Sequence, residues 1–144
     1  MDIENAVLIG ETLLKSFTLV LRDSSSVTRI DGVASFVGED ASGSFGILPG
    51  HARFMTSLGL GLARFRRDDG VWQYIAMPGA VLYFKDNLLS LCTRRFFLDD
   101  DYERITDTLT RQLLAEEEAL REVKQSLAQL EQEVLKRLWN LGHE

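Results

Sequence analysis

The sequence changes character at about residue 98, and this change constrains the fold more than any other feature. From Asp99 to Leu138 there is no glycine, no proline and no asparagine, and Leu, Glu, Arg, Gln and Ala dominate. Before this point, short runs rich in β-branched and aromatic residues are separated by turn residues. The sequence therefore predicts a β-rich part followed by an α-helical part.

The β-rich part has the rhythm of an all-β sandwich or barrel, which predicts about eight to ten strands. Candidate strands lie at residues 17–21, 26–30, 33–37, 44–48, within a longer segment at 53–66, and at 71–76, 80–84 and 88–93. Asp69-Gly70 is the clearest hairpin signal, because a two-residue primed turn needs positive φ at both positions. We expect an all-β sandwich.

Apolar residues of the helical part recur at steps of three and four, which places them on one face of a helix. They are Tyr102, Ile105, Leu109 and Leu113, then Leu120, Val123, Leu127, Leu130, Val134, Leu138 and Leu141. Between the two groups the same face carries Glu116. A single helix of about 40 residues would reach roughly 60 Å, far beyond a strand of about 20 Å. We therefore expect a C-terminal α-helical hairpin that turns near Ala115 to Glu118.

These features divide the chain into three parts. They are an N-terminal extension at 1–16, a β-sandwich domain at 17–97 and a C-terminal helical domain at 98–144. No apolar run reaches the length of about 18 residues that a membrane-spanning helix needs. Asp2, Glu4 and Glu11 stand where a signal peptide would carry positive charge. We expect a cytoplasmic chain that does not insert into a membrane.

The formal charge of -6 is carried entirely by the C-terminal part. Residues 1–98 contain ten acidic and ten basic residues, and residues 99–144 contain twelve acidic and six basic ones. Phosphate binding needs a basic face, so an acidic tail argues against a nucleic-acid partner. We expect none.

The pattern Gly-x-x-Gly-x-x-Pro-Gly-His, from Gly43 to His51, is the most unusual local feature. Its glycines lie in strand-like sequence and no Lys-Ser or Lys-Thr follows, which argues against a phosphate cradle. His51 has no local nucleophile or orienting acid, and His143 with the single Cys92 gives no metal-ligand spacing. No catalytic residue, cofactor or metal is predicted, and the apolar run around Cys92 predicts a small buried core residue.

The remaining interpretation is that this stretch forms a turn of defined shape. Pro49 fixes φ and removes a donor, while Gly50 permits a tight turn. Strand alternation places Ile47 in the core. For Phe45 and Leu48 both the core and an exposed edge stay open.

The same residues resemble the epsilon subunit of bacterial F-type ATP synthases. The matching motif is Gly43, Gly46, Ile47, Pro49, Gly50, His51 and Ala52, followed by GAVLYFKDNLLSLCT and a helical segment. The stretches GSFG and CTRR resemble the epsilon-like subunits of the alternative, sodium-type branch. The resemblance extends from about Phe17 to the end, and residues 1–16 have no counterpart in it.

The resemblance implies a non-catalytic rotor subunit of the central stalk. Such a subunit couples the gamma subunit to the membrane c-ring in ion-driven ATP synthesis or hydrolysis, at the cytoplasmic face of the cell membrane. It implies that the corner faces the gamma subunit and the c-ring loops, through Gly43, Ser44, Phe45, Leu48, Pro49, Gly50 and His51. The helical part would contact the catalytic alpha and beta subunits. Many members carry an acid where this chain has Ser44, so a ring contact that needs this carboxylate is not supported.

Many members of this family also carry an Ile/Leu-Asp-x-x-Arg-Ala motif at the start of the first helix, which is associated with ATP binding. Read from Leu98-Asp99, its Arg-Ala positions hold Tyr102-Glu103 here. Read from Tyr102-Glu103, they hold Thr106-Asp107. Neither register supplies the arginine for a phosphate. We expect no ATP binding at physiological concentrations and, because the tail has a net charge of -6, at most a weak brake on rotation.

A second class of protein fits the same residues. The spacing from Leu120 to Leu141 also suits the a and d positions of a coiled coil. The alternative is a free-standing β-sandwich adaptor that dimerises through its C-terminal helix. An enzyme is a more distant third.

Overall fold

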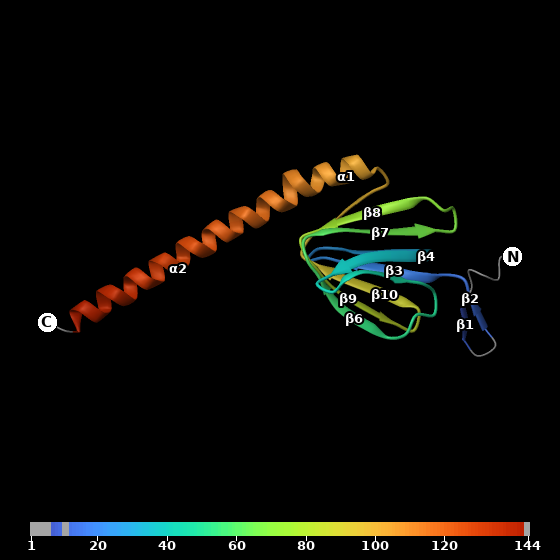
Figure 1. The fold of residues 1–144 in the computed structure, drawn as a ribbon, viewed down its shortest axis with the longest axis horizontal. Coiled ribbons are helices and arrows are strands. Elements are labelled where there is room, and N and C mark those ends of the chain that lie inside the picture. Colours follow the sequence, from blue (N-terminus) through green and yellow to red (C-terminus); the bar gives the residue numbers. More distant parts are fainter. Residues whose placement is uncertain (1–6, 10–11, 143–144) are drawn as a thin grey trace.

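A computed structural model describes residues 7–9 and 12–142 of the protein. In chain order its elements are β1 (Val7–Ile9), β2 (Thr12–Leu14), β3 (Phe17–Arg22), β4 (Val27–Asp40), β5 (Gly43–Ile47), β6 (Phe54–Leu58), β7 (Gly61–Arg67), β8 (Trp72–Met77), β9 (Ala80–Lys85), β10 (Leu88–Thr93), β11 (Phe97–Asp99), α1 (Tyr102–Thr108), the π-helical segment η2 (Leu109–Leu114) and α2 (Ala115–Leu141). The sandwich lies at one end of the molecule and α2 extends far beyond it (Figure 1).

Nine strands form one sheet in the order β11-β8-β7-β4-β3-β10-β9-β6, with β5 paired to β4. Strand β4 is 14 residues long. Its first half pairs with β3 and its second half with β5 and β7, so it takes part in both layers of the folded sheet. The segments 26–30 and 33–37, expected as separate strands, are both part of it. Gly32 has a φ of 71° where the register against β3 shifts, so Asp31-Gly32 forms a bulge instead of a turn.

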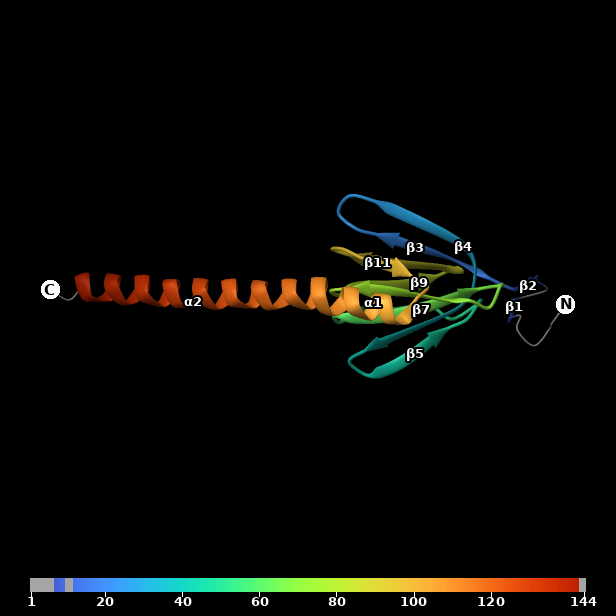
Figure 2. The same cartoon turned by 90° about the horizontal axis from the view of Figure 1, so that it is seen from above.

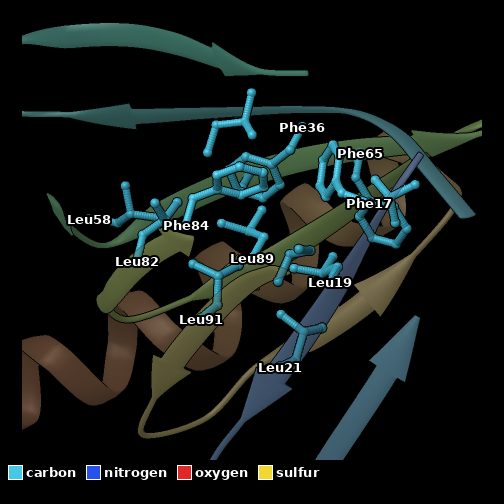
Figure 3. Packing of buried hydrophobic residues seen from close by; sticks show 14 of the residues in the cluster. Phe17, Leu19, Leu21, Phe36, Leu58, Phe65, Leu82, Phe84, Leu89 and Leu91 are labelled. Atoms are coloured by element: carbon cyan, nitrogen blue, oxygen red, sulfur yellow. The ribbon is translucent and has the colours of Figure 1, made fainter. Parts of the chain in front are cut away.

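The core lies between the two layers of the sandwich and confirms the all-β prediction (Figure 3). Alternate residues of each long strand point into it, as the strand period of two requires. The largest fully buried side chains include Phe36, Phe65 and Phe84, and the ring of Phe84 meets Phe17 edge-on at 5.6 Å between centroids. Ile47 is fully buried, as predicted. Cys92 is exposed, and the expectation of a buried cysteine was wrong because its neighbours Leu89 and Leu91 take the inward positions of β10.

The hairpin predicted at Asp69-Gly70 does not have the expected turn. Gly70 has a φ of 77°, but Asp69 does not have positive φ, and the Gly70 N–H bonds the Arg67 carbonyl at 3.0 Å. This is a longer connection than a two-residue primed turn. The primed turn occurs at Asp86-Asn87, where both φ angles are positive, 51° and 63°, between the paired residues Lys85 and Leu88.

The helical part confirms the prediction of helix after sandwich but contradicts the hairpin. From Tyr102 to Leu141 the backbone is one continuous rod through α1, η2 and α2, with no turn at Ala115 to Glu118 (Figure 2). Asp101 begins it, since its side chain accepts from the Arg104 N–H at 3.1 Å.

The interruption of the apolar face at Glu116 has another cause than a turn. Ile105 and Leu113 pack with Ala76 on the outer face of β8, and the helix then passes the edge of the sandwich. There Glu116 forms an ion pair with Arg95, and Glu117 forms one with Arg94 at 3.0 Å. The acidic positions therefore mark where the helix leaves the sheet.

Candidate partner-binding corner

The Pro49-Gly50 corner is a β-turn of type II between β5 and β6. The His51 N–H donates to the Leu48 carbonyl at 3.1 Å, and Gly50 has a φ of 77° at the third position of the turn. Pro49 precedes it with the φ that its ring imposes, and its side chain is buried. The residue types of the motif therefore determine the turn locally.

Asn87 fixes this corner to the rest of the sandwich. Its side-chain oxygen accepts from the Gly50 N–H at 2.9 Å, and its amide nitrogen donates to the Ser16 carbonyl at 2.5 Å. Its own carbonyl accepts from the Thr18 N–H at 3.2 Å. One residue in the β9–β10 turn thus holds the corner and the start of β3 together. The sequence signal was the turn-forming stretch Lys85-Asp86-Asn87 between two strand-like runs, although its contact with the corner could not be read from the sequence.

The predicted interface side chains divide into exposed and buried ones. Leu48 is 55% exposed. Phe45 is half-buried on the main core, and its ring lies 5.3 Å from Phe54 and 6.5 Å from Phe36. A Cβ at Gly38 would come within 2.9 Å of the Phe45 ring, so Phe45 needs a glycine beneath it. Leu48 is thus the apolar residue that the corner presents.

His51 is exposed and serves the packing of the corner. Its ring meets Phe54 and Phe84 edge-on, with centroids 5.7 and 5.8 Å apart, and its Nδ1 lies 2.7 Å from the Ala52 carbonyl. Each of these contacts is aromatic or to backbone. Within the described part of the chain, no group of three His, Cys, Asp or Glu side chains could hold a metal ion. His143 lies outside the described residues.

Gly43 and Ser44 lie apart from the rest of the predicted interface. They begin β5 beside the Ala41-Ser42 turn, whereas the corner follows the other end of this strand (Figure 2). Four residue steps along a strand separate Gly43 from Ile47, which is about 13 Å. Ser44 is exposed and pairs with Glu39 across the hairpin. The seven residues therefore form two surfaces rather than one.

An apolar surface near the corner was missed by the sequence reasoning. Met55 on β6 is 64% exposed and faces outward, paired in register with Tyr83 on β9. The Cζ of Arg53 lies 5.6 Å from the centroid of the Tyr83 ring. Val81 is exposed on the same face. The alternation of β6, in which Phe54 is half-buried and Leu58 buried, was the signal that could have placed Met55 outside.

Arg104 was also missed, because it occupies the arginine position of the nucleotide motif in a third register, which begins at Asp100-Asp101. Asp101 and Arg104 have the Asp-x-x-Arg spacing, with Ile105 in place of alanine. In the structure the Arg104 guanidinium donates twice to Asp99, at 2.7 Å each, and lies 3.3 Å from Asp100. This bonding holds the pKa of Asp99 well below its usual range and raises that of Arg104. The cation is therefore already neutralised by the chain itself.

The fold defines a class: a β-sandwich domain with an exposed apolar residue at its Pro-Gly corner, followed by a helical tail. Residues 17–99 match the family described as ATP synthase, Delta/Epsilon chain, beta-sandwich domain. The chain is 37% identical over 101 residues to ATP synthase epsilon chain 2 of Cereibacter sphaeroides, covering 69% of each chain. It is 33% identical over 92 residues to the ATP synthase epsilon chain of Leptospira borgpetersenii, covering 64% of this chain and 65% of the relative.

A solved structure shares the fold. It is the mitochondrial ATP synthase of Euglena gracilis, OSCP/F1/c-ring in rotational state 1, with a TM-score of 0.57, 16% identity, and coverage of 72% of this chain and 67% of that one. The chain belongs to the ATP synthase delta/epsilon family, and the resemblance to F-type epsilon subunits is confirmed.

Proposed function

We propose that the chain is a non-catalytic subunit of the rotor that joins a gamma-type stalk subunit to the loops of a membrane c-ring. In this role it couples ion-driven rotation to ATP synthesis or hydrolysis. The observation that carries the proposal is the corner, where Leu48 is held outward by a turn that Asn87 fixes to the sandwich. A rigid exposed apolar residue is what an interface anchor needs.

Its place in the cell follows from this role. No helix in the described part of the chain has the length and apolarity to cross a bilayer. From the proposed role, we propose that the subunit lies at the periphery of the membrane, on its cytoplasmic face, as part of the ATP synthase complex. Membership of the sodium-type branch stays a prediction.

Leu48→Asp tests the proposal. Placing a carboxylate at the anchor should weaken binding to the cognate gamma subunit by about 2–4 kcal/mol, while the thermal transition of the free chain stays unchanged. Val27→Asp is the matched control, because Val27 is 63% exposed and pairs with Arg22 at the far end of β3. Unchanged gamma affinity in Leu48→Asp would contradict the proposed contact.

We further propose that the tail does not bind ATP at physiological concentrations and brakes rotation weakly at most. Arg104, the one arginine in Asp-x-x-Arg spacing at the helix start, is bonded to Asp99, and the tail is acidic. Calorimetric titration with ATP, and ATPase rates of the complex with and without residues 99–144, test both parts. A sub-millimolar dissociation constant, or a several-fold rise in hydrolysis on truncation, would contradict them.

The coiled-coil adaptor keeps one supporting observation. The second apolar group of the helix, from Leu120 to Leu141, is exposed. Co-purification with the gamma subunit supports the rotor subunit, whereas a stable dimer whose helices pair between chains supports the adaptor.

A further inference from the structure

The outer face of β7 has a different character at its two ends. Ala63 and Phe65 point into the core, so Leu62, Arg64 and Arg66 alternate on the outer face. At the Leu62 end, α1 and η2 cover the sheet through Ile105 and Leu113 (Figure 1). At the other end Arg64, Arg66 and Trp72 lie beyond this cluster, and Trp72 is directly opposite Arg66 in register.

Two guanidinium groups converge on the single Trp72 ring. The Arg64 Cζ lies 4.4 Å from the ring centroid and the Arg66 Cζ lies 5.4 Å from it. Stacking fixes both side chains and leaves guanidinium nitrogens other than the buried Arg66 Nε available as donors. Two like charges held against one ring repel each other, and a bound anion would offset this repulsion.

No carboxylate of the described chain supplies this anion. Neither Arg64 nor Arg66 has an ion pair among the described residues, and the Arg66 Nε is buried with no hydrogen-bond partner there. Two acids of the neighbourhood are engaged elsewhere, and Glu39, which lines the same hollow as Arg64, forms no ion pair with it in the described part of the chain. Asp99, two strands from Arg64 in the same register row, is bonded to Arg104, and Asp69 accepts from the Val71 N–H at 3.0 Å.

We infer that this surface, Arg64, Arg66 and Trp72, docks a short acidic segment of a partner protein, with side-chain carboxylates received by the two guanidinium groups. A planar carboxylate matches the paired donors of a guanidinium. A long polyanion fits poorly, because the chain has a net charge of -6 and Asp68-Asp69 follow the strand directly. The inference rests on the cation pair and does not depend on the gamma contact of the corner.

The test is a titration of the ¹⁵N-labelled full chain with a hexaglutamate peptide. The indole N–H signal of Trp72 should shift saturably, and the signal is assigned by comparison with Trp139→Phe. The affinity should fall at least tenfold in the Arg64→Gln/Arg66→Gln variant and should decrease as salt is added. Arg64→Lys/Arg66→Lys should bind with intermediate affinity, because it keeps the charge but loses the planar donors.

Arg53→Gln is the matched control, since Arg53 also stacks on an aromatic ring, that of Tyr83, on another face of the sandwich. Its affinity for hexaglutamate should equal that of the wild type. The absence of a saturable shift, or equal affinity in the double glutamine variant, would overturn the inference. Tighter binding of inorganic phosphate, a single-stranded DNA 12-mer or phosphatidylglycerol vesicles would overturn the assignment to a protein partner.

Discussion

The first half of the C-terminal helix, up to Leu114, and the second half, from Ala115, have the same apolar spacing but opposite environments. In the first half Ile105 and Leu113 are completely buried against β8. In the second half Leu127 and Leu130 are 59% and 57% exposed, although they occupy equivalent steps of three and four. Spacing thus predicts which face of a helix is apolar, but burial depends on whether another element lies opposite that face.

Truncation should separate the two halves most strongly. A chain that ends at Asp99 should keep a cooperative thermal transition but lose about 3–6 kcal/mol of unfolding free energy, because two fully buried apolar side chains are removed and Ala76 is uncovered. A chain that ends at Glu118 should lose less than about 0.5 kcal/mol. Denaturant unfolding measures both. Loss of cooperativity in the first variant would mean that the helix completes the core of the sandwich.

One substitution made in each half gives a closer comparison. Leu113→Ala should cost about 2–5 kcal/mol, because it opens a cavity in a closed cluster. Leu127→Ala, at an exposed position, should stay within about 0.5 kcal/mol. Urea titrations of the two variants with equal m-values provide the measurement. Equal losses would show that the second half of the helix is buried in solution.

The boundary between the halves is held by two ion pairs. Replacing Arg94 and Arg95 by glutamine should cost about 0.2–1 kcal/mol for each pair, because these side chains are roughly half exposed. Amide exchange at residues 115–120 should accelerate, while exchange at Ile105 should not change. A double-mutant cycle with Glu116→Gln and Glu117→Gln isolates the pairs, and a coupling of zero would contradict their role.

The start of the packed half should carry a small pH dependence. The hydrogen bonds from Arg104 lower the pKa of Asp99 in the folded protein. The stability that this carboxylate contributes is therefore complete above its unfolded pKa, near 4, and is lost as the pH falls through the folded value. The difference in unfolding free energy between wild type and Asp99→Asn should shrink on acidification below about pH 4. A difference that does not vary with pH would assign the effect to packing.

The parts of the fold that follow from local chemistry were predictable. Pro49-Gly50 implies a tight corner, alternation places Ile47 in the core, and the absence of breakers after Asp99 implies helix. Only part of the predicted interface forms one surface, because Gly43 and Ser44 lie at the opposite end of β5 from the corner. The role of Asn87 could not be foreseen, since Gly50 is 37 residues away in sequence.

The sequence by itself determined the order of sandwich and helix, the corner and the apolar faces, because these depend on residue types within one turn or one strand. Only the tertiary structure decided that the helix continues past Glu116 and that Asn87 holds the corner to the sandwich. Each of these depends on which groups of distant segments meet, and a break in an apolar face looks the same in sequence whether the chain turns back or simply passes the edge of a sheet.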